Sequence, residues 1–266
     1  MNWGVVGVRV VVWNMQGKTD NWAKLAELDA DVALLCEAKV ADYPSSDHIA
    51  GKATTMGLDF ERQWSTAIVS RHELSEVTDA KASRRGKPID IPFGPSRPGS
   101  WTAASVRREE LEDFTVVSLY GLMDEKSDAS MHRSLSELTP IFEDDRYRHR
   151  LLIGGDFNVL AAPGPGDPAR ARHVLVLERM KAFGLVDCLE LRRPLGPLQG
   201  CRCGLDNDCR HTWTKFDPQR PTVAYQDDYL FASHSLAGAL DSCVAYDPRE
   251  WAFISDHAPI VAEFNI

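Results

Sequence analysis

The sequence predicts an α/β or α+β sandwich, because apolar runs with strand character recur along the chain and segments with helical periodicity lie between some of them. Of the 266 residues, 44% are hydrophobic and 26% charged, values typical of globular proteins and unlike those of disordered, collagen-like or coiled-coil chains. The Gly- and Pro-rich breaks at 86–99, 161–168 and 193–204 lack the length and polarity of interdomain linkers. We therefore expect residues 1–266 to form a single domain.

The expected strands are rich in β-branched residues and are bounded by Gly, Pro or Asp. In chain order they are Val8–Trp13, Val32–Leu35, Thr66–Val69, Thr115–Tyr120, Leu151–Ile153, Tyr229–Phe231 and Ile260–Phe264. Helices are expected where apolar residues recur at helical spacing, with Asp20 as N-cap of the first and Gly184 as C-cap of the last. These helices are Asn21–Leu28, Ser130–Phe142 and Ala169–Phe183.

The net charge of −9 argues against a protein that holds nucleic acid by bulk charge alone. The charge is uneven, however. Between Lys81 and Arg108, seven basic residues and one acid give a local balance of +6. An acidic enzyme with one basic loop suits a polyanionic substrate, and the candidate phosphate contacts are Arg84, Arg85, Lys87 and Arg97. An ordinary solvated loop explains the same residues.

No stretch approaches the roughly 18 uninterrupted apolar residues of a membrane span. The apolar start of the chain is interrupted by Arg9 and led by no basic segment, so it is typical of a strand rather than a signal peptide. With six unevenly spread cysteines, the expected location is the reducing cytoplasm. We expect neither a membrane partner nor an obligate protein partner.

Polar side chains end or open several of the apolar runs, where desolvation is costly unless they bind something. They are Asn14, Glu37, Asp156 and Asn158 of GGDFN, Asp228 of QDDYLFAS, and Asp256 and His257 of SDH. Asp156 and Asn158 are two residues apart, so on an extended segment both point to one side. Gly154 and Gly155 before them allow a backbone or a phosphate to approach closely.

Together and in this order, these fragments resemble the endonuclease/exonuclease/phosphatase superfamily, which includes exonuclease III-type abasic-site nucleases, DNase I, sphingomyelinases and inositol polyphosphate 5-phosphatases. The resemblance runs from Val8 to Phe264, and GGDFN and SDH are its most specific pieces. It implies a four-layer α/β/β/α sandwich of the DNase I type. It also implies a metal-dependent hydrolase of phosphate esters.

Such hydrolysis needs an activated water, neutralised oxygen charge and a supported leaving group. Because Mg²⁺ prefers oxygen ligands and keeps several waters, one or two carboxylates and an amide are enough to bind it. The resemblance implies Mg²⁺ or Mn²⁺ with Glu37 as principal ligand, Asn14 beside it and Asp256 close enough to bind the metal or orient its water.

The same resemblance assigns the remaining roles. Asp156 would orient and deprotonate the attacking water, with Asn158 hydrogen-bonded to it or to the phosphate. His257 would donate to the phosphoryl oxygens, and Asp228 would pair with it and raise its pKa. Tyr120 would face the scissile phosphate, although a core aromatic at a strand end explains it as well.

The preferred function is a metal-dependent phosphodiesterase that cuts nucleic acid, as an endonuclease or an exonuclease. The alternative is a phosphatase or phosphodiesterase for a small phosphorylated molecule or a lipid head group, which the acidic composition favours. The sequence departs from the exonuclease III pattern at Gln16, where that group has Asp, and at 121–123, where that group has Pro-Asn. The abasic-site signature is therefore not matched.

Further candidates lie outside the main motifs. Cys201, Cys203, Cys209 and His211 would suit a structural Zn²⁺, or are three free thiols and a histidine. Arg133 would reach a substrate phosphate or pair with Glu137. Trp213 would stack on a base or sugar, or pack in the core.

Overall fold

The computed structural model describes residues 7–44, 48–51, 64–80, 82–84, 87–89, 93–109, 111–123, 126–160, 168–193, 207, 209, 211–217, 219 and 224–266. Its first sheet contains β1 (Gly7–Asn14), β2 (Val32–Ala38), β3 (His48–Ala50), β4 (Ser65–Ser70), β15 (Leu240–Ala245) and β16 (Ile260–Asn265), in the order β15-β16-β1-β2-β4-β3. Strands β1 and β2 are parallel neighbours. Their carboxyl ends, which carry Asn14 and Glu37, therefore meet at one edge of the sheet.

The second sheet contains β5 (Glu73–Glu76), β8 (Trp101–Arg107), β9 (Phe114–Leu119), β10 (Leu151–Asp156), β11 (Leu185–Asp187) and β14 (Asp228–Ser233), in the order β11-β14-β10-β9-β8-β5. Strands β10 and β14 are antiparallel, and Asp156 lies directly opposite Asp228 in their register. The end of one strand and the start of the other thus bring two carboxyl groups together.

Two small hairpins and several helices complete the described part of the chain. The hairpins pair β6 (Ala82–Arg84) with β7 (Lys87–Ile89) and β12 (Lys215–Phe216) with β13 (Ala224–Tyr225). The helices are α1 (Asn21–Glu27), a 3₁₀ turn (Val40–Asp42), α2 (Ser127–Glu137), α3 (Thr139–Glu143), α4 (Asp145–Arg148), α5 (Arg170–Ala182), α6 (Cys188–Arg192), α7 (His234–Gly238) and α8 (Pro248–Trp251). None of these helices is long and apolar enough to cross a bilayer.

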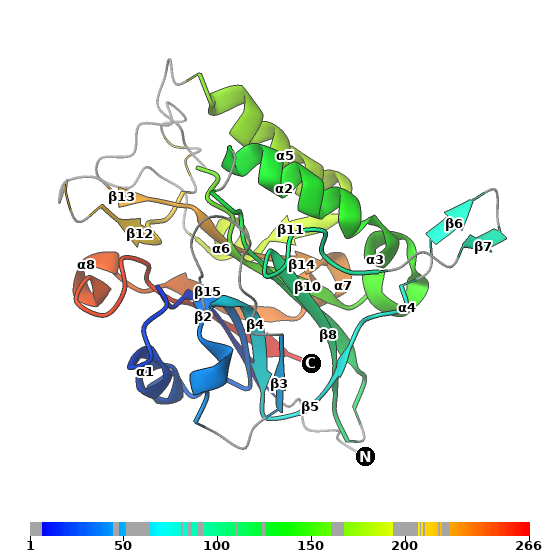
Figure 1. Cartoon of the computed structure of the whole chain (residues 1–266), viewed down its shortest axis with the longest axis horizontal. Helices are drawn as coiled ribbons and strands as arrows, with labels where there is room; N and C mark the ends of the chain where they lie inside the picture. The colour runs from blue at the N-terminus through cyan, green and yellow to red at the C-terminus, as the bar shows by residue number, and fades with distance from the viewer. Residues whose placement is uncertain are drawn as a thin grey trace.

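The two sheets pack face to face, and helices cover their outer faces (Figure 1). Successive side chains of β1 point to opposite faces of the first sheet. Val10 and Val12 lie in the core between the two sheets, whereas Val11 and Trp13 pack with Trp22 of α1 on the outer face. On the other side, Met131 of α2 joins the core between the second sheet and its helices. These layers form the four-layer α/β/β/α sandwich that the sequence predicted.

All seven strands expected from the sequence are present, five of them within two residues at each end, while β2 and β10 each continue three residues beyond the expected end. The expected helix Ser130–Phe142 is instead two helices, α2 and α3, because Pro140 lies in the first turn of a new helix. Asp20 occupies the N-cap position of α1 as expected, but its side chain makes no capping hydrogen bond. Gly184 follows α5 with a φ of +80°, as expected of a C-cap.

Candidate active site

Polar residues from both sheets converge where the strands end. Asn14 links them, because its Nδ2 donates to Glu37 Oε1 at 3.2 Å and to Asp156 Oδ2 at 2.9 Å. Its Oδ1 accepts the backbone N–H of Gln16 at 2.9 Å, which fixes the amide in this orientation. One buried side chain therefore joins a carboxylate of the first sheet to a carboxylate of the second.

Glu37 lies at an irregularity of β2, between the pairs Leu35↔Ala67 and Ala38↔Ser65 in the register with β4. Its φ of +50° is in the left-handed region, which costs a non-glycine residue about 1–3 kcal/mol. Bulges of this kind re-aim a side chain. Here the carboxylate also accepts a hydrogen bond of 2.9 Å from the hydroxyl of Tyr120.

Asp156 is 1% exposed, and each of its two carboxylate oxygens accepts a hydrogen bond. Oδ1 accepts the backbone N–H of Asn158 at 2.8 Å, and Oδ2 lies 3.2 Å from Asn158 Nδ2. The two residues meet through this turn, in which Asn158 has a φ of +49°, rather than through an extended strand as the sequence spacing had predicted. The close approach allowed by Gly155 is to the β9 backbone, because an added Cβ would lie 2.0 Å from the Leu119 carbonyl oxygen.

His257 lies between the two opposed carboxyl groups of the second sheet. Its Nδ1 is 2.8 Å from Asp228 Oδ2, and its Nε2 is 3.6 Å from Asp156 Oδ2. The loop that carries it is fixed to the end of β1, since Ser255 Oγ donates to the Asn14 carbonyl and accepts the His257 N–H. Asp256 is partly exposed, and its Oδ1 lies 4.0 Å from His257 Nε2.

The electrostatics of this cluster follow from burial and from neighbouring charges. Burial acts to lower the pKa of His257, but Asp228 and Asp156 outweigh it and raise the pKa to about 10. Burial raises the pKa of Asp156 to about 7, an effect that His257 opposes. Burial and Glu37 hold the pKa of Tyr120 far above its ordinary value, so its hydroxyl remains a donor. The neighbouring carboxyl groups thus favour the protonated imidazole of His257, while burial favours the protonated carboxyl group of Asp156.

Sequence reasoning missed two charged groups of this cluster. Asp227 is buried, and one ligand atom each from it, Asp156 and His257 lie within 4.8 Å of one another. Lys215 Nζ is 3.6 Å from Asp227 Oδ2, and Lys215 is bridged to His257 through the backbone. Burial acts to lower the pKa of Lys215, but Asp227 and Asp156 keep it above its ordinary value. The QDD doublet was the only sequence signal for Asp227, and β12 is too short to reveal Lys215.

The donor atoms fit a hard divalent cation. Glu37 and Asp256 offer carboxylate oxygens, the ligands that Mg²⁺ takes, whereas Asn14 points Nδ2 at Glu37 and would have to turn its amide to offer Oδ1. The grouping of Asp156, Asp227 and His257 fits less well, because the imidazole uses Nδ1 for Asp228 and its raised pKa favours the protonated ring. The cluster as a whole has more carboxylates than cationic side chains, which also favours a bound cation.

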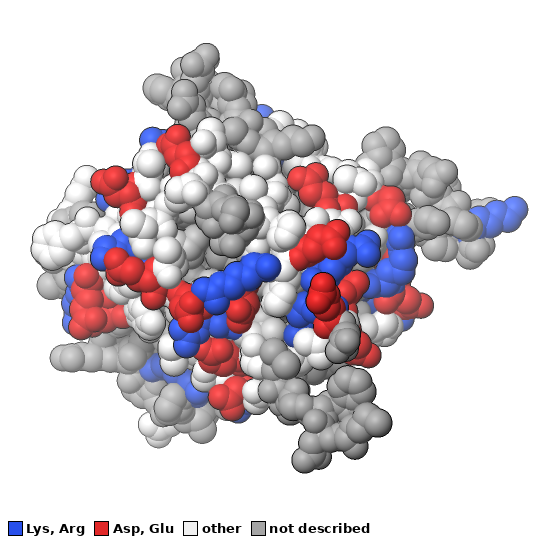
Figure 2. Space-filling view, turned by 90° about the horizontal axis from the view of Figure 1, so that it is seen from below, with Lys and Arg blue, Asp and Glu red and all other residues white. Residues whose placement is uncertain are grey.

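The predicted phosphate contacts Arg84 and Lys87 belong to the separate hairpin β6–β7. Arg84 is on β6 and pairs in register with the exposed Lys87 of β7, while Arg85 is outside the described residues. Hairpin β6–β7 projects at one end of the long axis, and β12–β13 lies at the other (Figure 1). Figure 2 shows basic side chains at the edge where the hairpin projects and mixed charges over the rest of that face.

The other candidates are described in part. Arg133 is half-buried on α2, and Glu137 accepts hydrogen bonds from Ser96 and from Trp101. Trp213 is half-buried, one residue before the Thr214 hydroxyl that accepts the backbone N–H groups of 227 and 228. Of the proposed zinc ligands, Cys209 Sγ lies 3.6 Å from His211 Nδ1, and Cys201 and Cys203 lie outside the described residues.

No protein-family model matches the chain, and no curated protein matches it. Solved structures do. A structure described as 3' phosphatase NExo from Neisseria bound to product DNA hairpin has a TM-score of 0.69 and 19% identity, covering 97% of this chain and 100% of that one. An AP endonuclease from Archaeoglobus fulgidus has a TM-score of 0.65 and 18% identity, covering 97% and 100%.

A third similar structure is an endonuclease/exonuclease/phosphatase from Beutenbergia cavernae, with a TM-score of 0.58 and 15% identity, covering 98% of this chain and 72% of that one. Identities this low show a shared fold. The chain has the endonuclease/exonuclease/phosphatase fold, and the resemblance drawn from GGDFN and SDH is confirmed at that level.

Proposed function

We propose that this chain, which has the fold of the endonuclease/exonuclease/phosphatase proteins, is a divalent-metal-dependent phosphodiesterase that hydrolyses nucleic acid. The observation that carries the proposal is the buried series Asp228–His257–Asp156, with distances of 2.8 Å and 3.6 Å, beside the Glu37 carboxylate that Asn14 links to it. This arrangement supports His257 as a proton donor and Asp156 as a proton acceptor, beside carboxylate and amide groups that would bind a cation.

Each side chain has a role that its geometry permits. Asp156, with a pKa raised to about 7, orients the attacking water and accepts its proton, and Asn158 holds the carboxylate in place. His257, fixed by Asp228 at Nδ1, donates from Nε2 to a phosphoryl oxygen. Tyr120 keeps its proton and positions Glu37 beside the phosphate.

The metal would be held by Glu37, Asn14 and Asp256. When bound, Mg²⁺ or Mn²⁺ neutralises charge on the phosphate oxygens and on the leaving group. Lys215, paired with Asp227 and bridged to His257 through the backbone, supplies a positive charge next to the buried carboxyl groups.

A polymeric substrate is supported by the position of the basic residues. Hairpin β6–β7 projects at the end of the molecule opposite hairpin β12–β13, and Lys215 of β12 is bridged to His257, so a small phosphate ester bound at His257 would be too short to contact both (Figure 1). A nucleic acid strand can, and counterion release at the hairpin would then add to affinity. Two of the similar structures are described as an AP endonuclease and as a 3' phosphatase bound to product DNA.

The test is turnover with Mg²⁺ or Mn²⁺, against EDTA, on plasmid, single-stranded DNA, an abasic duplex, RNA and small phosphate esters. Asp156→Ala, purified in parallel, controls for contaminating nucleases. We expect metal-dependent cleavage of at least one polynucleotide that is absent in the variant. Turnover of small esters alone would refute the nuclease proposal and favour the phosphatase alternative, which the net charge of −9 also favours.

A further inference from the structure

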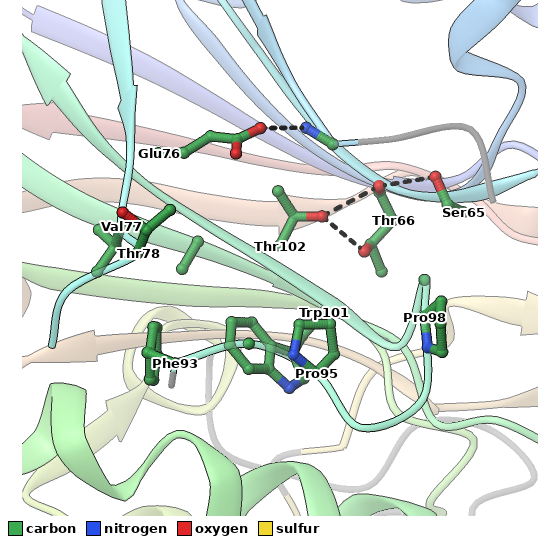
Figure 3. A pocket seen from close by; sticks show the side chains of 14 residues that line it. Ser65, Thr66, Glu76, Val77, Thr78, Phe93, Pro95, Pro98, Trp101 and Thr102 are labelled. Carbon is green, nitrogen blue, oxygen red and sulfur yellow. Dashed lines mark hydrogen bonds between the residues drawn. The ribbon is translucent and has the colours of Figure 1, made fainter. Parts of the chain in front are cut away.

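A pocket opens between the two sheets, where β4 of the first sheet faces β5 and β8 of the second. Its volume is about 320 Å³, at the lower end of the range of small-molecule sites. Figure 3 shows Phe93, Pro95, Pro98 and Trp101 on one side of it and Thr66, Thr102 and Glu76 on the other. The site described above does not include any of these residues.

The apolar wall of the pocket is aromatic and held in place. The rings of Phe93 and Trp101 pack with centroids 5.0 Å apart and a tilt of 46°. Trp101 is 4% exposed and its Nε1 donates to Glu137 Oε2 at 2.9 Å, so the indole is a fixed support behind the half-buried Phe93. A flat aromatic ligand would stack on such a wall without ordering new side chains.

The polar wall has hydrogen-bonding groups and a negative charge. The hydroxyls of Thr66 and Thr102 are 2.9 Å apart, and the exposed Glu76 offers a carboxylate acceptor. Among the described residues that line the pocket, none is Lys, Arg or His. A phosphate would be repelled here, whereas a ring with N–H donors would be bound.

The pocket adjoins the candidate active site through backbone pairing. Ser65, which lines it, pairs with Ala38, the residue after Glu37. Ser100, between the lining residues Gly99 and Trp101, accepts the backbone N–H of Tyr120 at 2.7 Å. Neighbouring strands are about 4.8 Å apart, so the pocket lies within one or two strand spacings of both site residues.

We propose that this pocket is a subsite for the nucleobase of a nucleotide next to the scissile phosphate. The inference rests on the proposed function, which places the phosphate at His257, and it names the part of the substrate that the pocket takes. A base stacked in a duplex cannot enter a pocket, so the nucleotide bound there is single-stranded, terminal or flipped out. The subsite therefore predicts a preference for unpaired nucleotides over intact duplex.

The variants that test the subsite are Phe93→Ala, which removes the aromatic wall, and Glu76→Gln, which replaces a pure acceptor by an amide of the same shape. Glu73→Gln is the matched control, because Glu73 is exposed on the same strand but does not line the pocket. Equilibrium binding is measured in EDTA, with a labelled single-stranded DNA and with a strand of equal length whose sugars carry no bases.

We expect Phe93→Ala to weaken binding of the base-containing strand by about fivefold to a hundredfold, the effect of losing one base–aromatic stack. Its affinity for the base-free strand should not change. Glu76→Gln should alter the preference among homopolymer strands, since an amide donates as well as accepts. Glu73→Gln should not.

Equal affinity of the unaltered protein for both strands, or unaltered affinity in both Phe93→Ala and Glu76→Gln, would overturn the subsite. Hydrolysis with Mg²⁺ is measured in parallel. Base-dependent binding without hydrolysis would refute the proposed function and leave the subsite standing. If hydrolysis is lost in Asp156→Ala but its KM is the same in Phe93→Ala, Glu76→Gln and the unaltered protein, the proposed function stands and the subsite is refuted.

Discussion

Lys215 offers a direct test of the charge balance at the candidate site. Its Nζ is 3.6 Å from Asp227 Oδ2, and the side chains are 24% and 6% exposed. Lys215→Met would leave Asp227 buried beside Asp156 and Asp228 without its cation. Removing one partner of a buried ion pair costs about 3–5 kcal/mol, and the partial exposure of Lys215 places the expected loss near 3 kcal/mol.

A loss of about 3 kcal/mol lowers the melting temperature by roughly 6–12 °C in a chain of this size. Thermal unfolding at pH 7.5 in EDTA measures it. The double variant Lys215→Met/Asp227→Asn should recover most of the loss, because the unpaired carboxylate is then gone. Mg²⁺ should raise the melting temperature of Lys215→Met more than that of the unaltered protein, since the variant site is more negative.

Lys24→Met is the matched control, because it breaks the exposed pair with Glu27, in which the side chains are 42% and 64% exposed. Such a surface pair is worth about 0–1 kcal/mol, so the change should stay below roughly 4 °C. If Lys215→Met melts within the range of Lys24→Met, or if the double variant is no more stable than the single one, Lys215 does not balance the buried carboxylates.

Three other predictions follow from the same structure. Asp156→Ala and His257→Ala should each abolish most turnover while circular dichroism still shows the native fold; near-normal rates in both would exclude the proposed mechanism. Burial raises the pKa of Asp187 to about 7. Because the folded chain then keeps a proton that the unfolded chain loses above about pH 4, this residue lowers stability as pH rises toward 7, by up to ~4 kcal/mol. Asp187→Asn, which can still cap α6, should match the unaltered protein in urea unfolding at pH 4 and exceed it at pH 8; a difference independent of pH would refute this. Neutralising the basic residues of the β6–β7 region should reduce the salt dependence of DNA binding by about 0.7–0.9 in log–log slope per lost phosphate contact, and an unchanged slope would show that they are only solvated. These residues are Arg84, Arg85 and Lys87.

The strand ends could be predicted from the sequence because an apolar run that stops at a polar residue marks both the strand and its edge. Asn14, Glu37 and Asp156 were found in this way, and the structure joins all three by hydrogen bonds. The left-handed backbone of Glu37 could not be predicted, since it depends on where β4 forces the register of β2 to shift. Local propensity contains no information on such a long-range pairing.

Lys215 and the pocket could not be predicted from the sequence either, because both depend on contacts between distant segments. Strand β12 has only two residues, and its relation to His257 is a single bridge between segments more than forty residues apart in the sequence. Phe93 and Glu76 come from different segments of the chain and line the pocket from opposite sides. Neither has a periodicity or a motif from which a contact could be inferred.

The arrangement of Asp156 and Asp228 shows why this site depends on the whole sheet. Like charges directly opposite each other on neighbouring strands are destabilising, and these two carboxyl groups are exact register partners. His257 lies between them and offsets the repulsion when it is protonated, and the raised pKa of Asp156 gives a second way to relieve it. A shift of one residue between β10 and β14 would turn one of the two side chains to the other face and separate the pair from His257. The pairing that fixes the second sheet is therefore also what sets the charge, and so the proposed chemistry, of the site.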